Sequence, residues 1–231
     1  MTYSIAIDGP AGAGKSTIAK LLAEKLDFIY VDTGAMFRGI AVAVIRAGID
    51  PEDEETVTKL CREVDIRVEY KDGNMIINID GCDITGSLRD EETGKISSVI
   101  AVYGSVRDKL LALQRDIAEK YNVVMDGRDI GSVVLPNATI KIYLSASAVA
   151  RGMRRYRELE EKGIESNLTQ IISDIRERDY RDMNREIAPL SVAEGAHAID
   201  SSDMTVDEVM AECLKLVGEN KALSEVYHGG V

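Results

Sequence analysis

The sequence predicts an α/β fold in which a parallel sheet of five strands is flanked by helices. Short apolar segments typical of strands alternate with segments whose apolar residues recur at helical spacing. A glycine-rich loop joins the first predicted strand to the first predicted helix. One further segment breaks the alternation with two runs of period two, which is the pattern of an antiparallel hairpin.

The five predicted strands are short apolar runs that end in charged, polar or turn-forming residues. They are Ser4–Asp8, Phe28–Val31, Val123–Asp126, Thr139–Leu144 and Ala196–Asp200.

The predicted helices that follow these strands carry start and stop signals. The first two cover Gly14–Leu26 and Gly34–Ala47, the second being ended by Gly48 and Pro51. The closing helix begins at a capping box formed by Thr205 and Glu208. No helical stripe is visible over Ser224–Val231, so we expect that segment to be frayed.

The hairpin pattern predicts a small insert in an otherwise continuous domain. Apolar and polar residues alternate over 64–68 and again over 75–79, on either side of an Asp72-Gly73 turn. We predict one domain over residues 1–231, with this insert at about 63–99.

Composition excludes several classes of function. A net charge of −12 argues against broad binding to nucleic acid or to an anionic membrane. No stretch reaches the roughly 20 apolar residues that a membrane span needs, and the N-terminus does not resemble a signal peptide. Three widely spaced cysteines indicate neither a metal site nor a disulfide framework. We therefore expect a cytoplasmic protein.

The glycine-rich loop matches the Walker A pattern at every fixed position, with a strand before it and a helix after it. Glycines bring backbone N–H groups against phosphate oxygens, and the positive end of the following helix faces the same anion. Lys15 can then reach the β- and γ-phosphates of ATP, and Ser16 can offer its hydroxyl to Mg²⁺. The predicted ATP-binding residues are Gly9, Pro10, Ala11, Gly12, Ala13, Gly14, Lys15, Ser16 and Thr17.

Asp126 ends a purely apolar strand, at the place where a carboxylate near the magnesium ion is expected beside such a loop. Many strands end in Asp, so this signal counts only together with the loop. We predict that Ser16, and Asp126 through water, hold Mg²⁺.

A later helical pattern changes character along its length. Leu168, Ile171 and Ile175 form an apolar stripe that we expect to face the core. The same face continues as Arg178, Asp182 and Arg185. Arg178 and Asp182 could be a surface ion pair worth a few tenths of a kcal/mol. The alternative is that this end of the helix overhangs a cleft and points at an anionic ligand.

Four arginines lie within residues 151–157, directly after a predicted strand. They could be a solvated helix face. They also lie near the carboxyl edge of the sheet, where ligands bind in open α/β folds. An arginine-rich helix there can close over phosphates and exclude water, so we predict a lid at about 148–163.

Taken together, these motifs resemble the bacterial-type cytidylate kinases, which are nucleoside monophosphate kinases. The resemblance covers nearly the whole chain, from Ile5 to the closing helix. The segments that carry it are Asp8–Ser16, Asp32–Arg38, Asp126–Gly131, Arg178–Arg185 and Ala188–Leu190. The hairpin insert is also similar to this family, in which it binds the monophosphate, and the fold implied is that of the P-loop NTPases.

The resemblance implies a role for each matching residue. Three groups of acceptor residues are implied: Thr33, Arg38, Arg128 and Arg185 for the phosphate, Ser98, Arg107 and Asp129 for the cytosine edge, and Arg178 and Asp182 for the sugar. The lid would carry Arg151, Arg154 and Arg155, and catalysis would depend on Lys15, Arg128, Arg151 and Arg155.

Two positions depart from the pattern expected of the family. Thr33 stands where Ser is common and keeps the hydroxyl. Phe37, also expected at the acceptor, stands where Tyr is common and lacks the hydroxyl while keeping the ring.

The predicted reaction is phosphoryl transfer from ATP to CMP or dCMP by a monomer that binds neither nucleic acid nor membrane. One alternative is a kinase of the same fold acting on another small acceptor, such as UMP or a sugar-like acid. A nucleotide-binding module without catalysis is a second alternative, against which the lid arginines count. A GTPase is disfavoured, because the sequence contains no Asn-Lys-x-Asp tetrapeptide for guanine.

Overall fold

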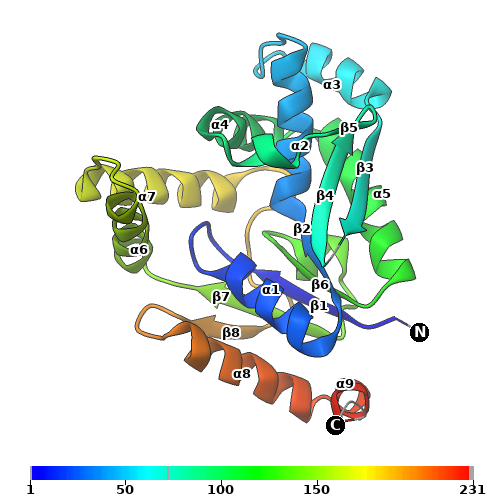
Figure 1. The fold of residues 1–231 in the computed structure, drawn as a ribbon, viewed down its shortest axis with the longest axis vertical. Coiled ribbons are helices and arrows are strands. Elements are labelled where there is room, and N and C mark those ends of the chain that lie inside the picture. Colours follow the sequence, from blue (N-terminus) through cyan, green and yellow to red (C-terminus); the bar gives the residue numbers. More distant parts are fainter. Residues whose placement is uncertain (1, 72, 229–231) are drawn as a thin grey trace.

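A five-stranded parallel sheet forms the centre of the molecule (Figure 1). The computed structural model describes residues 2–71 and 73–228. The strand order across the sheet is β2 (Ile29–Asp32), β6 (Val123–Gly127), β1 (Ser4–Asp8), β7 (Ile140–Ser145) and β8 (His197–Asp200). All five predicted strands are confirmed, with ends that differ by at most one residue.

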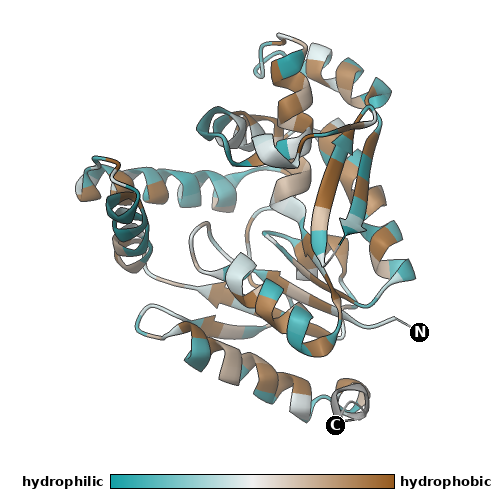
Figure 2. Cartoon of the chain, in the orientation of Figure 1, coloured by the Kyte–Doolittle hydropathy of each residue, from teal (hydrophilic) through white to brown (hydrophobic). Residues whose placement is uncertain are grey.

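Alternation along β1 divides the core into two parts. Ile5 and Ile7 face one side of the sheet, where α1 (Lys15–Leu26), α8 (Val206–Glu219) and α9 (Lys221–His228) pack. Ala6 faces the other side, which is covered by α2 (Thr33–Arg46) and α5 (Gly104–Lys120), and α3 (Glu54–Glu63) packs on these two helices. The hydropathy colouring shows the same arrangement, with brown on the sheet and on the inner helix faces (Figure 2).

The insert is a three-stranded antiparallel sheet of β3 (Ile66–Lys71), β4 (Asn74–Ile79) and β5 (Cys82–Asp83). It confirms the predicted hairpin and adds β5, a pair of residues too short to leave a pattern. Ile66 and Ile77 are buried against α2, so the predicted apolar face is the inner one. Asp72, half of the predicted turn, lies outside the described residues. The chain continues through a 3₁₀ turn at Thr85–Arg89 to α4 (Glu91–Ile100). The predicted boundaries of the insert and the lid remain predictions.

Two helices form an arm beside the sheet (Figure 1). They are α6 (Ala148–Glu161) and α7 (Leu168–Asn184), and they pack closely, because a Cβ on Gly152 would lie 2.5 Å from the Ile172 side chain. The prediction that Leu168, Ile171 and Ile175 face the core was wrong, since α7 has no buried residue. The arm stands away from the main body, so these side chains are only half covered.

The C-terminus also corrects an expectation. Residues 224–228 belong to α9 and are not frayed, whereas residues 229–231 lie outside the described part. Leu223 is buried in the core beside α8, and the Asn220 side chain accepts hydrogen bonds from the backbone N–H groups of Ala222 and Leu223. The α8 capping box of Thr205 and Glu208 is confirmed. Over the described residues, no helix combines the length and apolar character that a bilayer crossing requires.

Candidate active site

The glycine-rich loop lies between β1 and α1 at the carboxyl edge of the sheet. Gly9 has a φ of 147°, and a Cβ there would lie 1.9 Å from the Leu144 carbonyl oxygen of β7. Gly14 caps α1 in a left-handed conformation with a φ of 92°. Only glycine adopts these positions without strain, so the loop backbone can approach phosphate closely.

Lys15 is buried beneath this loop, and its Nζ donates to the Pro10 carbonyl at 2.8 Å. Burial, and then the nearby Arg128 guanidinium, lowers the pKa of Lys15. A phosphate would supply the negative charge that favours the ammonium form. The Lys15 side chain is thus fixed beside the glycine-rich loop, where a phosphate would bind.

Asp126 at the end of β6 faces Ser16 at the start of α1. The Ser16 hydroxyl donates to Asp126 at 2.9 Å, and the Tyr30 hydroxyl donates to the other carboxylate oxygen at 3.0 Å. Burial, and then the Asp32 charge, raises the pKa of Asp126. The hydroxyl and carboxylate oxygens are ligands of the kind that Mg²⁺ takes. Within the described residues, no cluster of three His, Cys, Asp or Glu side chains is placed to hold a metal ion by itself.

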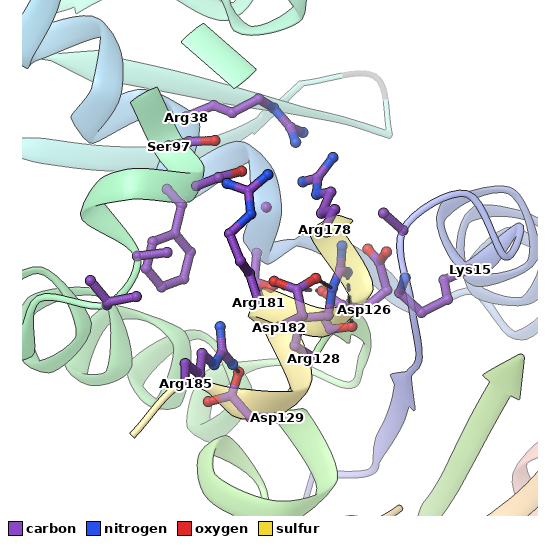
Figure 3. Close-up of a pocket in the computed structure, with 18 of the residues that line it drawn as sticks. Lys15, Arg38, Ser97, Asp126, Arg128, Asp129, Arg178, Arg181, Asp182 and Arg185 are labelled. Carbon is purple, nitrogen blue, oxygen red and sulfur yellow. Dashed lines mark hydrogen bonds and ion pairs between the residues drawn. The ribbon is translucent and has the colours of Figure 1, made fainter. Parts of the chain in front are cut away.

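A cavity of about 560 Å³ opens directly beside Lys15 and Ser16 (Figure 3). Seven basic and four acidic residues line it, so it is electropositive in a chain of net charge −12. The cavity contains every residue that the family resemblance implied for the acceptor: Thr33, Phe37, Arg38, Ser98, Arg107, Arg128, Asp129, Arg178, Asp182 and Arg185. Of the predicted ATP-binding loop, Ala11, Gly12, Lys15 and Ser16 line it, whereas Gly9, Pro10, Ala13, Gly14 and Thr17 do not.

Ion pairs orient several of the cavity arginines. Arg38 donates to Asp32 at 2.9 Å, and Arg128 Nε donates to Asp182 at 2.8 Å. The Asp182 partner is therefore Arg128 on the loop after β6, and the surface pair of Asp182 with Arg178 is not formed. Arg178 has no ion pair or hydrogen bond within the described part of the chain. Its guanidinium points into the cavity near those of Arg38 and Arg181 (Figure 3).

Asp129 forms a second, more buried constellation in the same cavity. Its carboxylate accepts from Arg107 through one oxygen and from Arg185 through the other at 3.3 Å. The Arg107 guanidinium also lies 5.8 Å above the Phe37 ring, so the ring packs here without the hydroxyl of a tyrosine. The hydroxyl of Ser98, nearby on α4, is bound to the Gly94 carbonyl of its own helix. These residues form a polar end to the cavity that is fixed in orientation.

Asp8, the last residue of β1, connects the segment that follows β6 to the start of the glycine-rich loop. Its two carboxylate oxygens accept from the backbone N–H groups of Ile130 and Gly131, each at 2.7 Å. Burial raises the pKa of Asp8 to about 6, although the two N–H groups act in the opposite direction. One buried side chain thus fastens the segment that follows Asp129.

None of the three predicted lid arginines lines the cavity. Arg151 is buried and bonded to Asp179 and to backbone carbonyls, Arg154 donates to the Ser201 carbonyl, and exposed Arg155 pairs with Glu158. All three lie on α6, and Arg155 is the one whose side chain is exposed and paired only within its own helix.

Sequence reasoning missed several residues of the site. Asp32 caps α2 through the Ala35 N–H and orients Arg38, and its place just before a helical pattern was a usable signal. Asp8 and Asp179 bind partners distant in sequence, and no local pattern indicates them. Four further polar side chains of the cavity were also given no role: Ser97, Tyr180, Arg181 and Asn184.

Comparison with known proteins identifies the relatives of this chain. The family described as cytidylate kinase matches residues 5–219. The "Cytidylate kinase" of Caldicellulosiruptor bescii is 44% identical over 92% of this chain and 94% of its own length. That of Caldicellulosiruptor saccharolyticus is 45% identical over the same shares. Among solved structures, an uncharacterized protein from Eubacterium ventriosum aligns with a TM-score of 0.51 at 13% identity, covering 93% of this chain and 98% of the other, which is a likeness of fold alone.

Proposed function

The chain belongs to the cytidylate kinase family, and from that premise we propose that it transfers a phosphoryl group from ATP to CMP, giving ADP and CDP. The observation that carries this assignment is the shared cavity. One wall is the glycine-rich loop with Lys15, and another holds the buried Arg107–Asp129 pair. A nucleoside monophosphate that reaches from one to the other would present its phosphate to the donor loop and its base to Asp129.

On the donor side, the chain supplies position and charge. The loop N–H groups and the Lys15 ammonium would hold the β- and γ-phosphates of ATP, and the start of α1 would face them with its positive end. A loose phosphoryl-transfer transition state spreads charge over its equatorial oxygens. Cations already in place stabilise that charge without reorganising.

We include Mg²⁺ as the metal bound with ATP. Ser16 and Asp126, whose oxygens lie 2.9 Å apart, would hold the ion, Asp126 through a water molecule. When bound, the ion neutralises charge on the phosphates of ATP. The Tyr30 hydroxyl keeps the Asp126 carboxylate turned toward Ser16.

On the acceptor side, three groups of residues would divide the nucleotide among them. As the family resemblance implies, Arg38, Arg128, Arg185 and the Thr33 hydroxyl would hold the phosphate, and Arg178 and Asp182 would contact the sugar. Thr33 already donates to the Asp126 backbone carbonyl at 2.7 Å, which places this residue at the junction of the donor and acceptor sides. Because Arg178 is unpaired among the described residues, an anionic or hydroxylated ligand can bind it without breaking an ion pair.

The base would be read by Asp129, Arg107 and Ser98. An ionised carboxylate only accepts hydrogen bonds, so it matches the exocyclic amine of cytosine and meets another acceptor in uracil. No observation favours the UMP alternative. We extend the proposal to dCMP, because the base and phosphate contacts do not involve the 2′-hydroxyl.

We propose a single P-loop kinase domain with a monophosphate-binding insert at about 63–99 and a lid at about 148–163. Closure of the lid would bring Arg155 toward the phosphates and exclude water. We further propose a monomer that acts in the cytoplasm without nucleic-acid or membrane partners.

A coupled assay of ADP formation across all nucleoside monophosphates and their deoxy forms tests the assignment. CMP and dCMP should be turned over with the highest kcat/KM, and chelation of Mg²⁺ by EDTA should abolish activity. Faster turnover of a purine monophosphate, or of UMP, would overturn the proposed acceptor. ADP formation at the same rate without any acceptor would instead indicate an ATPase.

A further inference from the structure

A single buried side chain on the arm joins three segments of the molecule. The Arg151 guanidinium donates to the Ala146 carbonyl before α6 and to the Ala11 carbonyl of the glycine-rich loop, both at 2.9 Å. Its Nη1 and Nη2 atoms also donate to the two carboxylate oxygens of Asp179 on α7, at 2.9 and 2.5 Å. The Arg151 side chain is 3% exposed and that of Asp179 is 15% exposed, so solvent screens this bidentate pair poorly.

The two ends of this connection belong to opposite sides of the proposed reaction. Ala11 of the glycine-rich loop lines the cavity. The Arg151 side chain lies beside this loop, because a Cβ on Gly12 would be 3.6 Å from the Arg151 Cβ. Asp179 is adjacent to Arg178 and lies less than one helical turn from Asp182, both of which line the acceptor part of the cavity.

Helix α7 depends on polar contacts for its position. None of its residues is buried, and it packs on α6 with half-covered apolar side chains. Three ion pairs connect it and the residue after it to the remainder of the described molecule: Asp179 with Arg151, Asp182 with Arg128, and Arg185 with Asp129. Of these, the pair with Arg151 is the one that reaches the donor loop.

We propose that the Arg151–Asp179 ion pair couples the ATP-binding loop to the acceptor-binding helix, with Asp179 as a positioning residue. Phosphates bound by the loop would fix the Ala11 carbonyl, and that carbonyl would fix Arg151 and therefore α7. Arg178 and Asp182 would then be held in the orientation that binds the acceptor. The inference rests on the proposed function, because it assumes that ATP and CMP occupy these two sides.

Coupling of this kind is reciprocal and can be measured directly as a ratio of affinities. Calorimetry would give the Kd of CMP with and without a saturating, non-hydrolysable ATP analogue and Mg²⁺. For the native protein we expect the analogue to tighten CMP binding by roughly 5-fold or more. In Asp179→Asn, which removes the carboxylate and keeps the size, we expect the ratio to fall to about 1.

Asp174→Asn is the matched control. Asp174 lies on the same helix and is exposed, and its only described bond is from the Gln170 side chain at 2.7 Å. The variant Asp174→Asn removes the same charge from α7, but this side chain has no described contact with the glycine-rich loop. The ratio of CMP affinities with and without the ATP analogue should therefore stay at its native value. A native ratio in Asp179→Asn, equal loss in both variants, or no coupling in the native protein would each overturn the inference. Failure of the native protein to phosphorylate CMP would overturn the proposed function itself.

A measurement on the native protein keeps the inference testable if Asp179→Asn does not fold. Hydrogen–deuterium exchange would be followed at the loop amides of residues 11–14 while CMP alone is added. Slower exchange in this segment is expected, because acceptor binding orders α7 and, through Arg151, the loop. Unchanged exchange there, with CMP saturating, would contradict the coupling.

Discussion

Arg107 and Asp129 form an ion pair in the cavity, and both partners are anchored before any ligand binds. Arg107 also donates to the Ala101 carbonyl at 3.1 Å and lies over Phe37, while Asp129 also binds Arg185. A carboxylate held by two guanidinium groups has little freedom to rotate. A group fixed in this way discriminates between ligands, because it cannot turn away from a mismatched one.

Lys15 gives the first prediction. Lys15 lies beneath the glycine-rich loop, where its positive charge would face the transferring phosphoryl group. Lys15→Ala should therefore lower kcat by at least about 100-fold, with little effect on folding. Lys20→Ala, on an exposed position of the same helix, should retain native kcat. Steady-state ADP formation and thermal unfolding measure both effects. Near-native turnover in Lys15→Ala would refute the role assigned to this loop.

The lid gives the second prediction. Without CMP the site is expected to stay open and wet, so ATP hydrolysis should be slow. Arg155→Ala should reduce kcat more than CMP affinity, because Arg155 lies outside the cavity and would reach the phosphates only on closure. Arg157→Ala, exposed on the same helix, serves as the control. Equal rates of ADP formation with and without CMP would exclude a closing lid.

Asp182 gives the third prediction. Asp182→Ala should weaken binding of CMP and dCMP by about 1–3 kcal/mol, the range for a lost charged hydrogen bond. It would also release Arg128, the present partner of Asp182. Binding of both nucleotides is compared with that of Asp174→Ala, which changes an exposed carboxylate on the same helix. If the affinities of Asp182→Ala match the native ones, Asp182 does not contact the sugar.

Continuous or alternating apolar runs made the fold readable from the sequence. Val123–Met125 reads as a buried strand because no polar residue interrupts it, and the glycines before Lys15 define the loop by themselves. The stripe on α7 was misread, because periodicity shows only that a face is apolar and does not show what covers it.

The contacts of the site were less accessible to sequence reasoning. Asp8 binds the N–H groups of Ile130 and Gly131 across a separation of more than 120 residues, and Arg151 binds Asp179 across 28. Such pairings depend on which strands are neighbours and on how the arm lies. The acceptor residues implied by family resemblance do gather in one cavity, which shows that they are close but leaves their individual roles as predictions.

Asp8 gives the fourth prediction, which concerns pH. A carboxyl with a folded-state pKa raised from 3.8 to about 6 binds its proton more tightly in the folded state. Its contribution to folding therefore falls as pH rises from about 4 to 6 and stays low above that. In Asp8→Asn this dependence is absent, so the stability of the variant relative to the native protein should improve by up to about 3 kcal/mol across the window.

Urea unfolding of both ligand-free proteins between pH 4 and pH 7 measures this difference. Other carboxyl groups contribute equally to both proteins and cancel. If the stability of Asp8→Asn relative to the native protein falls with rising pH, the two backbone N–H donors outweigh burial at Asp8, which is the opposite of the prediction.

Asp129 gives the last prediction, which tests most directly the proposed recognition of cytosine in this cavity. The measurement is kcat/KM for CMP and for UMP, with the native protein and with Asp129→Asn. The native protein should prefer CMP strongly, since uracil would leave the carboxylate facing an acceptor at a buried position. Asp129→Asn should narrow the preference, because an amide donates as well as accepts. The same CMP to UMP ratio in both proteins would show that Asp129 does not read the base.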